Sequence, residues 1–230
     1  MEDVFHEYMS KRLKEETKEG PQKEAGPIIT ISRAAGCTAN QIAKSIALKI
    51  SSKTNINWEV INKEILLESA KALQITPDKL KEIYKNTDRS LMDEIAQAFI
   101  SNTYKLERKF RKTIVDIILR FAYEGNKIIV GRASNIICSN IKNSLHIRID
   151  APLEWRINNT MQSRNLNKEQ ALIYISDTEK DRADFRKSVK GKKVICEDFD
   201  LTLNQAKFTD DEIIDIICST IKVKQIVNFG

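Results

Sequence analysis

The chain has 230 residues and a formal net charge of +6, from 38 lysines and arginines against 32 aspartates and glutamates. Hydrophobic residues make up 41% of it, and the seven glycines and four prolines are few, which argues against a long disordered chain and indicates a globular protein. No apolar stretch approaches the roughly eighteen residues of a transmembrane helix. Residues 1–16 are highly charged and unlike a secretory signal, so we expect a cytoplasmic protein.

The chain order predicts a charged N-terminal helical arm, residues 1–25, followed by one domain, residues 26–230. In the domain, short β-branched runs typical of buried strands alternate with amphipathic helices. Strands are expected at residues 28–31, 127–131, 145–149 and 199–204, and helices at 39–51, 152–164, 167–187 and 209–221, with 59–125 mostly helical. This alternation predicts an α/β fold with a parallel sheet covered by helices on both faces. Whether the arm packs on its own domain or joins a homodimer stays open.

The cysteines are far apart and form no CxxC pair. They are Cys37, Cys138, Cys196 and Cys218. Only two histidines accompany them, so the sequence predicts reduced, buried thiols and no structural zinc site.

The turn after the first strand is the first candidate site, because ligands of parallel sheets bind beyond the carboxyl ends of the strands. Small residues lead there into a helix N-terminus, whose free N–H groups suit a phosphate. Read against the phosphate-loop pattern GxxxxGK[ST], however, Arg33 and Thr38 replace the two glycines. Ala39 replaces the lysine and Asn40 the hydroxyl residue. The bare motif therefore fails.

A collinear series of segments changes that interpretation. The stretch ITISRAAGCTANQIA resembles the opening of the cytidylate kinase-like family, a branch of the P-loop nucleoside monophosphate kinases. WEVINKEIL, IIVGRASNII, LHIRIDAPLEWRI, TEKDRADF and FDLTLN continue the resemblance to about residue 221. The resemblance implies a three-layer P-loop kinase-type fold with a helical acceptor-binding insertion at residues 59–125 and a short helical lid at 176–193. The implied reaction is transfer of a phosphoryl group from ATP to CMP, dCMP or a related nucleoside monophosphate.

The resemblance also implies roles for individual residues. The implied catalytic residues are Arg132, which would hold the acceptor, and Lys180, Arg182 and Arg186 of the lid. The implied donor-phosphate residues, acting through the backbone, are Arg33, Gly36, Cys37, Thr38, Ala39 and Asn40. Asn62 and Lys63 would join Arg132 at the acceptor. Arg156 is a candidate phosphate contact, with a salt bridge on the helix surface as the alternative. Mg²⁺ would be held mainly by the nucleotide, since the sequence offers no metal cluster.

Three departures from the family bear on this function. The family's GSGG reads Gly36-Cys37-Thr38-Ala39 here, so side chains replace glycines that can adopt positive φ. Asn62 stands where the family tends to have an aspartate, and Ala133 stands where bacterial cytidylate kinases carry one. The residues that would select the base are thus missing. Asp150, the best-placed remaining acid, is expected to cap the helix that follows it.

Three functions stay open. The first is an active nucleoside monophosphate kinase, favoured by Arg132 and the lid arginines. The second is a catalytically impaired nucleotide-binding protein of the same fold, a sensor or partner, favoured by the altered loop. The third, with least support, is nucleic-acid binding through the basic segments 104–112 and 179–193.

Overall fold

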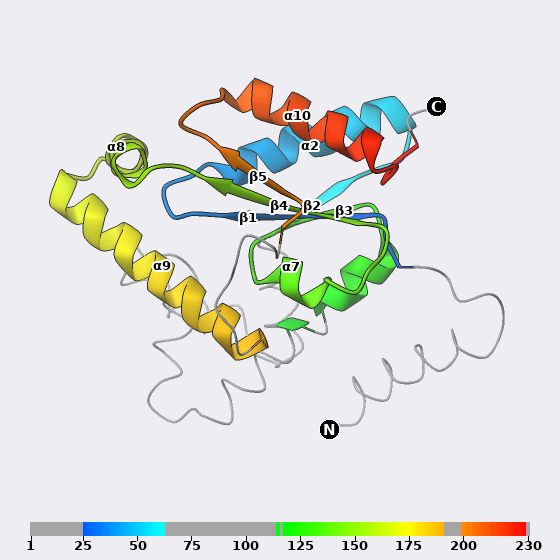
Figure 1. The fold of residues 1–230 in the computed structure, drawn as a ribbon, viewed down its shortest axis with the longest axis horizontal. Coiled ribbons are helices and arrows are strands. Elements are labelled where there is room, and N and C mark those ends of the chain that lie inside the picture. The colour runs from blue at the N-terminus through cyan, green and yellow to red at the C-terminus, as the bar shows by residue number, and fades with distance from the viewer. Residues whose placement is uncertain (1–24, 63–113, 116, 191–198, 229–230) are drawn as a thin grey trace, which may run out of the picture.

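The computed structural model describes residues 25–62, 114–115, 117–190 and 199–228 (Figure 1). The N-terminal arm, most of the expected acceptor-binding insertion, Lys63 and Cys196 lie outside the described residues.

Five strands form one sheet in the order β2-β3-β1-β4-β5, and every neighbouring pair is parallel. The strands are β1 (Ile28–Arg33), β2 (Glu59–Ile61), β3 (Lys127–Val130), β4 (Ser144–Asp150) and β5 (Leu201–Asn204). The central strand β1 pairs Ile29 with Ile128 of β3 and with Leu145 of β4. All three side chains are fully buried, which explains why these strands read as continuous apolar runs.

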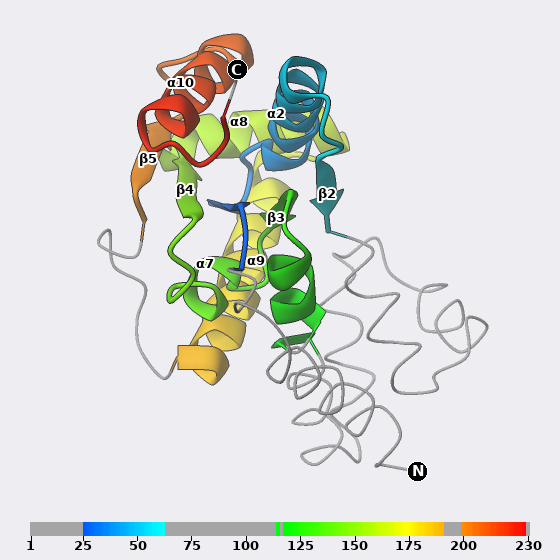
Figure 2. The same cartoon turned by 90° about the vertical axis from the view of Figure 1, so that its right-hand side faces the viewer.

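Helices cover both faces of the sheet, as Figures 1 and 2 show. One face carries α2 (Ala39–Thr54) and α10 (Asp210–Val223), whose isoleucines pack on the strands in one buried cluster. The other face carries α7 (Ser134–Ile137), the helical residues 117–124 and α9 (Lys168–Lys190), while α8 (Leu153–Arg164) joins β4 to α9. The predicted fold class, a three-layer α/β protein of the P-loop kinase type, is confirmed.

The expected strands and helices are present in the described residues, with small shifts at their ends. β2 was not anticipated: residues 59–61 are too few to show a period, and only their pairing with β3 makes them a strand. Asn167 precedes α9 as expected, and its side chain accepts a hydrogen bond from the Gln170 amide at 2.9 Å. Residues 176–190, the described part of the expected lid, belong to the 23-residue helix α9.

The expected capping role of Asp150 is wrong. The N-cap of α8 is Pro152, with no side-chain cap. Oδ1 of Asp150 accepts from the amide of Ala151 at 2.9 Å, and Oδ2 accepts from the guanidinium of Arg148 at 2.8 and 2.9 Å. An arginine two residues earlier on the same side of the strand therefore competes successfully for this carboxylate.

His146 of β4 is half-buried and joins a polar network between the strands. The Ser144 hydroxyl donates to the Ile141 carbonyl at 2.6 Å, so it accepts from Nε2 of His146, and the Thr30 hydroxyl lies 2.8 Å from Nδ1. In a neutral imidazole protonated at Nε2, Nδ1 accepts from Thr30. Burial lowers the pKa of His146, with Asp200 opposing the shift and Lys224 adding to it.

We expect this histidine to make stability depend on pH. Because its pKa is lower in the folded chain, the unfolded chain binds more protons, and the free energy of unfolding falls as pH drops below about 6.5. The slope contributed is at most about 1.4 kcal/mol per pH unit. Urea unfolding at several pH values between 7.5 and 5 should show a shallower loss for His146→Gln than for the unmodified chain. An equal loss in both proteins would contradict this assignment.

Candidate functional site

Three arginines from separate elements meet at the carboxyl edge of the sheet, and we call them the arginine cluster: Arg33, Arg132 and Arg182. Arg33 ends β1, Arg132 follows β3, and Arg182 lies on α9, where its Nη1 donates to the Arg33 carbonyl at 3.1 Å. Burial and the positive charges of Arg182 and Arg132 together lower the pKa of Arg33 to about 9. Arg33 stays protonated at neutral pH, so the cluster is a concentrated positive site that suits an anion.

The turn after β3 contains Arg132 and lies against the side chain of Arg33. Gly131, Arg132 and Ala133 have φ values of 78°, 58° and 53°, a run of three left-handed residues. Non-glycine residues in this region cost roughly 1–2 kcal/mol each, and such strain gathers at functional sites. A Cβ at Gly131 would overlap Nη1 of Arg33, so that guanidinium would have to shift. This contact and the φ of 78° together favour glycine at this position of the VGR segment.

Further charged groups extend the site toward α8 and α9. Arg148 of β4, which sequence reasoning missed, binds Asp150 and lies over the Phe199 ring at 5.8 Å from its centroid. Burial and the nearby charge of Arg148 lower the pKa of Arg186, while Glu179 opposes the shift. A charged residue near the carboxyl end of a buried strand was the available signal for Arg148.

The loop between β1 and α2, residues 34–38, is held by side chains of α8 and α9. Arg156 donates to the Ala35 carbonyl at 3.1 Å, and Asn159 donates to the Gly36 carbonyl at 2.6 Å. Arg156 also donates to the Ala151 carbonyl and pairs with Glu179 at 2.7 Å. The salt-bridge alternative for Arg156 is thus present, but its side chain is only 12% exposed and also binds the loop.

The replaced glycines cause no backbone strain. Gly36 has a φ of 91°, whereas Cys37, Thr38 and Ala39 are absent from the positive-φ residues of the described chain. The strain considered from the sequence therefore does not occur at Thr38 or Ala39, the two positions where the family has glycine. Burial raises the pKa of Cys37 to about 11, so its thiol is protonated at neutral pH. Sequence reasoning also missed Gln205, whose Oε1 accepts from the Thr38 amide at 3.0 Å.

The other sequence-predicted site residues differ in how far they are exposed to solvent. Asn62 follows β2 at the same edge of the sheet and is half-buried, whereas Lys63 lies outside the described residues. Asn40 is exposed in the first turn of α2, and Lys180 is exposed on α9. The structure therefore brings Arg33, Arg132 and Arg182 together, but it does not bury Lys180 with them.

No group of three His, Cys, Asp or Glu side chains that could hold a metal ion occurs within the described residues. Both oxygens of Asp150 already accept hydrogen bonds, from Arg148 and from Ala151. The charged groups gathered at this edge of the sheet are mainly guanidiniums, which suit an anion.

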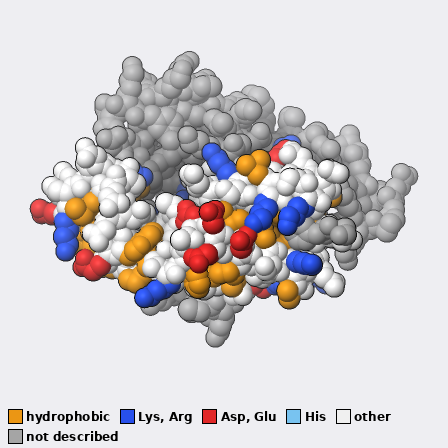
Figure 3. All heavy atoms as spheres, turned by 90° about the horizontal axis from the view of Figure 1, so that it is seen from above, with side chains coloured by type: hydrophobic (Ala, Val, Ile, Leu, Met, Phe, Trp, Pro, Cys, Tyr) orange, Lys and Arg blue, Asp and Glu red, His pale blue; other side chains and the backbone are white. Residues whose placement is uncertain are grey.

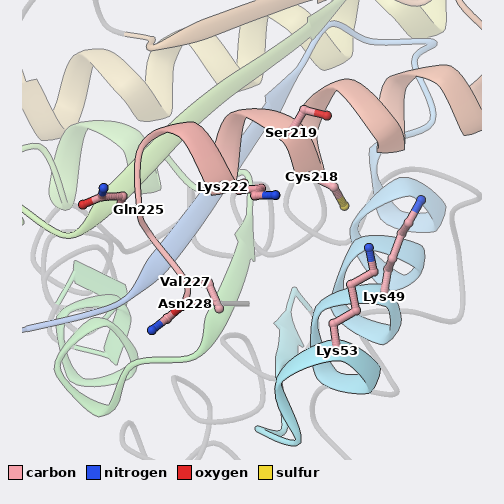
Figure 4. A pocket seen from close by; sticks show the side chains of 8 residues that line it. All are labelled: Lys49, Lys53, Cys218, Ser219, Lys222, Gln225, Val227 and Asn228. Atoms are coloured by element: carbon pink, nitrogen blue, oxygen red, sulfur yellow. The ribbon is translucent and has the colours of Figure 1, made fainter. Parts of the chain in front are cut away.

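A cavity of about 910 Å³ lies apart from this site (Figure 4). Its lining residues are Lys49, Lys53, Cys218, Ser219, Lys222, Gln225, Val227 and Asn228. It sits by the C-terminal halves of α2 and α10, two helices that begin at the carboxyl edge of the sheet, so it lies toward the opposite edge. Lys49 pairs with Asp215, and Lys53 and Lys222 occupy last helical turns, where positive charge suits the helix dipole.

The outer face that carries α2 and α10 shows acidic and basic side chains interspersed with apolar ones (Figure 3). A surface of one charge sign is therefore not visible on this face. No helix within the described parts of the chain is both long enough and apolar enough to cross a bilayer.

Fold and site together define a kinase-type α/β protein with a basic site at the carboxyl edge of its sheet. The chain belongs to the cytidylate kinase-like family, whose model matches residues 28–207. The resemblance seen in the sequence is thereby confirmed. Family and fold support a kinase-like nucleotide-binding protein.

Solved structures similar to this chain include the following two. An uncharacterized protein from Eubacterium ventriosum ATCC 27560 is 18% identical with a TM-score of 0.59, over 85% of this chain and 98% of that chain. Shikimate kinase from Acinetobacter baumannii in complex with shikimate is 12% identical with a TM-score of 0.47, over 89% of this chain and 97% of that chain. No curated protein matches the chain.

Proposed function

We propose that this protein is a nucleoside monophosphate kinase that transfers the γ-phosphoryl group of ATP to CMP, dCMP or a related nucleotide. The observation that carries the proposal is the arginine cluster at the carboxyl edge of the sheet, where Nη1 of Arg182 donates to the Arg33 carbonyl at 3.1 Å, and where burial and the charges of Arg182 and Arg132 lower the pKa of Arg33. Bringing two polyanions together requires such concentrated positive charge, and phosphoryl transfer needs positioning and charge neutralisation more than covalent help.

Each part of the site has a proposed role. Arg132 holds the acceptor phosphate, together with Asn62 and Lys63 after β2. The backbone from Arg33 to Asn40 meets the donor phosphates. Arg182 and Arg186, with Lys180 beside them, form the lid side of the site and stabilise the charge on the transferred group. Arg156 supports the loop and lies next to the donor position. Mg²⁺ would be held mainly by the phosphates and water, and would neutralise charge on the β- and γ-oxygens.

In the proposed reaction, an oxygen of the acceptor phosphate attacks the γ-phosphorus of ATP. The bond from that phosphorus to the β–γ bridging oxygen breaks, and ADP leaves with the electron pair. Each guanidinium can bind two oxygens at once and keeps its charge throughout. It can therefore stay hydrogen-bonded to the phosphoryl oxygens while the group passes from donor to acceptor.

A coupled assay with ATP and Mg²⁺ against each nucleoside monophosphate and deoxynucleoside monophosphate tests this proposal. We expect ADP to appear in step with one nucleoside diphosphate. ATP binding without any diphosphate product would refute the kinase proposal and favour the alternative below.

The second candidate is a nucleotide-binding protein of the same fold without turnover, a sensor or partner. One contact favours it: the Thr38 amide, at the start of α2 where a phosphate would bind, already donates to Gln205 at 3.0 Å. Gln205 also donates to Asp210 at 2.8 Å, so the contact belongs to a wider network. Thermal stabilisation by ATP, without product formation, would be its signature.

Three further expectations are proposals as well. A cytoplasmic location can be tested by cell fractionation, and a homodimer by sedimentation. The nucleic-acid function relies on residues 104–112, which lie outside the described residues, and on 179–193. A steep fall of polynucleotide affinity with salt would support it.

A further inference from the structure

Glu179 of α9 occupies an anion-binding position beside the β1–α2 loop. Its Oε1 accepts from Nη1 of Arg156 at 2.7 Å and from the Ala35 amide at 3.4 Å. Burial and Arg148 lower the pKa of Arg186 and the charge of Glu179 opposes this shift, which places a second guanidinium within electrostatic reach of Glu179. A carboxylate that accepts from a backbone N–H and a guanidinium, with the charge of a second guanidinium nearby, has the kinds of partner that a phosphate oxygen would have in this site.

The two partners of this ion pair differ in how firmly the fold holds them. Arg156 is 12% exposed and also donates to the Ala35 and Ala151 carbonyls, so its position does not depend on Glu179. The Glu179 side chain is 43% exposed, so another anion can reach its position from solvent. An incoming anion would thus find the arginine and the amide already oriented, at little ordering cost.

We propose that the Glu179 carboxylate occupies the position of a donor phosphate oxygen in the ligand-free protein and yields it when a polyphosphate binds. This inference rests on the proposed function for the identity of the ligand as a nucleotide polyphosphate. Because α9 also binds the Arg33 carbonyl through Arg182, three positions away, the exchange links the loop to the lid side of the site. Glu179 is then a competitor of the ligand and not a residue that positions the loop.

The two roles predict opposite results for Glu179→Gln. Removing a negative charge a few ångströms from the bound anion should tighten binding at least about tenfold, whereas loss of a positioning residue would weaken it. Isothermal titration of the full chain with inorganic tripolyphosphate and with ATP measures the change. Asp177→Asn is the matched control, since Asp177 is exposed on the same helix, and we expect less than about a twofold change there.

Equal or weaker binding of tripolyphosphate by Glu179→Gln, or no binding by either protein, would overturn the inference. An active unmodified kinase with no tightening in the variant refutes the inference alone. Tightened tripolyphosphate binding without nucleotide phosphotransfer refutes the kinase proposal alone.

A second measurement uses the unmodified chain, so it tests the inference even if the variant does not fold. Tripolyphosphate should shift the NMR carboxyl resonance of Glu179 and leave that of Asp177 in place, and an unmoved Glu179 resonance counts against the exchange.

Discussion

Arg182→Ala should lower kcat/KM for phosphotransfer by about a thousandfold, and Arg132→Ala should do the same. Both guanidiniums belong to the arginine cluster, and loss of one donor to the transferred group costs this much in related chemistry. Steady-state kinetics with ATP and the acceptor found in the coupled assay measure the loss.

Arg120→Ala is the matched control for charge. Arg120 is exposed and pairs with Glu124 four residues on, at 3.2 Å, so its removal should change kcat/KM less than about twofold. Arg182→Lys separates charge from geometry, because lysine keeps the charge without the planar fork. Thermal unfolding establishes that each variant is folded. Full activity of both alanine variants would show that the cluster is not the reaction site.

Gly36→Ala should destabilise the protein by about 3 kcal/mol and weaken nucleotide binding. The φ of Gly36 is 91°, and a Cβ there would lie 2.8 Å from the Arg156 carbonyl oxygen and 2.9 Å from Cβ of Arg156. Because these atoms belong to the backbone and stem of α8, neither can move away cheaply. Urea unfolding measures the loss of stability, and titration with ATP measures the loss of affinity.

Cys37→Ala is the control for this substitution, since Cys37 is the next residue and has no positive φ. Its half-buried thiol is small, so we expect a loss of about 1 kcal/mol. If Gly36→Ala were as stable as Cys37→Ala, the close packing of α8 on the loop would be wrong.

The fold was predictable from the sequence because its signals are local. Ile28 to Ile31 form a β-branched run, which predicts a buried strand. Ile42, Ile46 and Ile50 recur at helical spacing, which predicts a helix and identifies its buried face. β2 escaped prediction because three residues carry no period and pair only through β3. The wrong prediction that Asp150 caps α8 has a similar origin. A capping motif is recognised from neighbouring residues in the sequence, whereas the contact between Asp150 and Arg148 depends on the geometry of the strand.

The site was predictable in part. The resemblance identified Arg33, Arg132 and Arg182 one by one. Their spacing along the chain does not predict that these three arginines lie close together. Arg33 and Arg182 are 149 positions apart, and only the β1-to-α9 packing joins them. The part of the insertion that contains Lys63 lies outside the described residues, so its place at the acceptor stays a prediction.

The sequence by itself determined the globular class, the parallel α/β fold, the family and the basic character expressed in a net charge of +6. These properties follow from composition, periodicity and motif order. Only the tertiary structure decided how the glycine-poor loop is held: Asn159 and Arg156 bind its carbonyls, while Gln205 binds the Thr38 amide. Such contacts depend on the direction of each side chain after the helices dock, and that direction is set by packing across the whole domain.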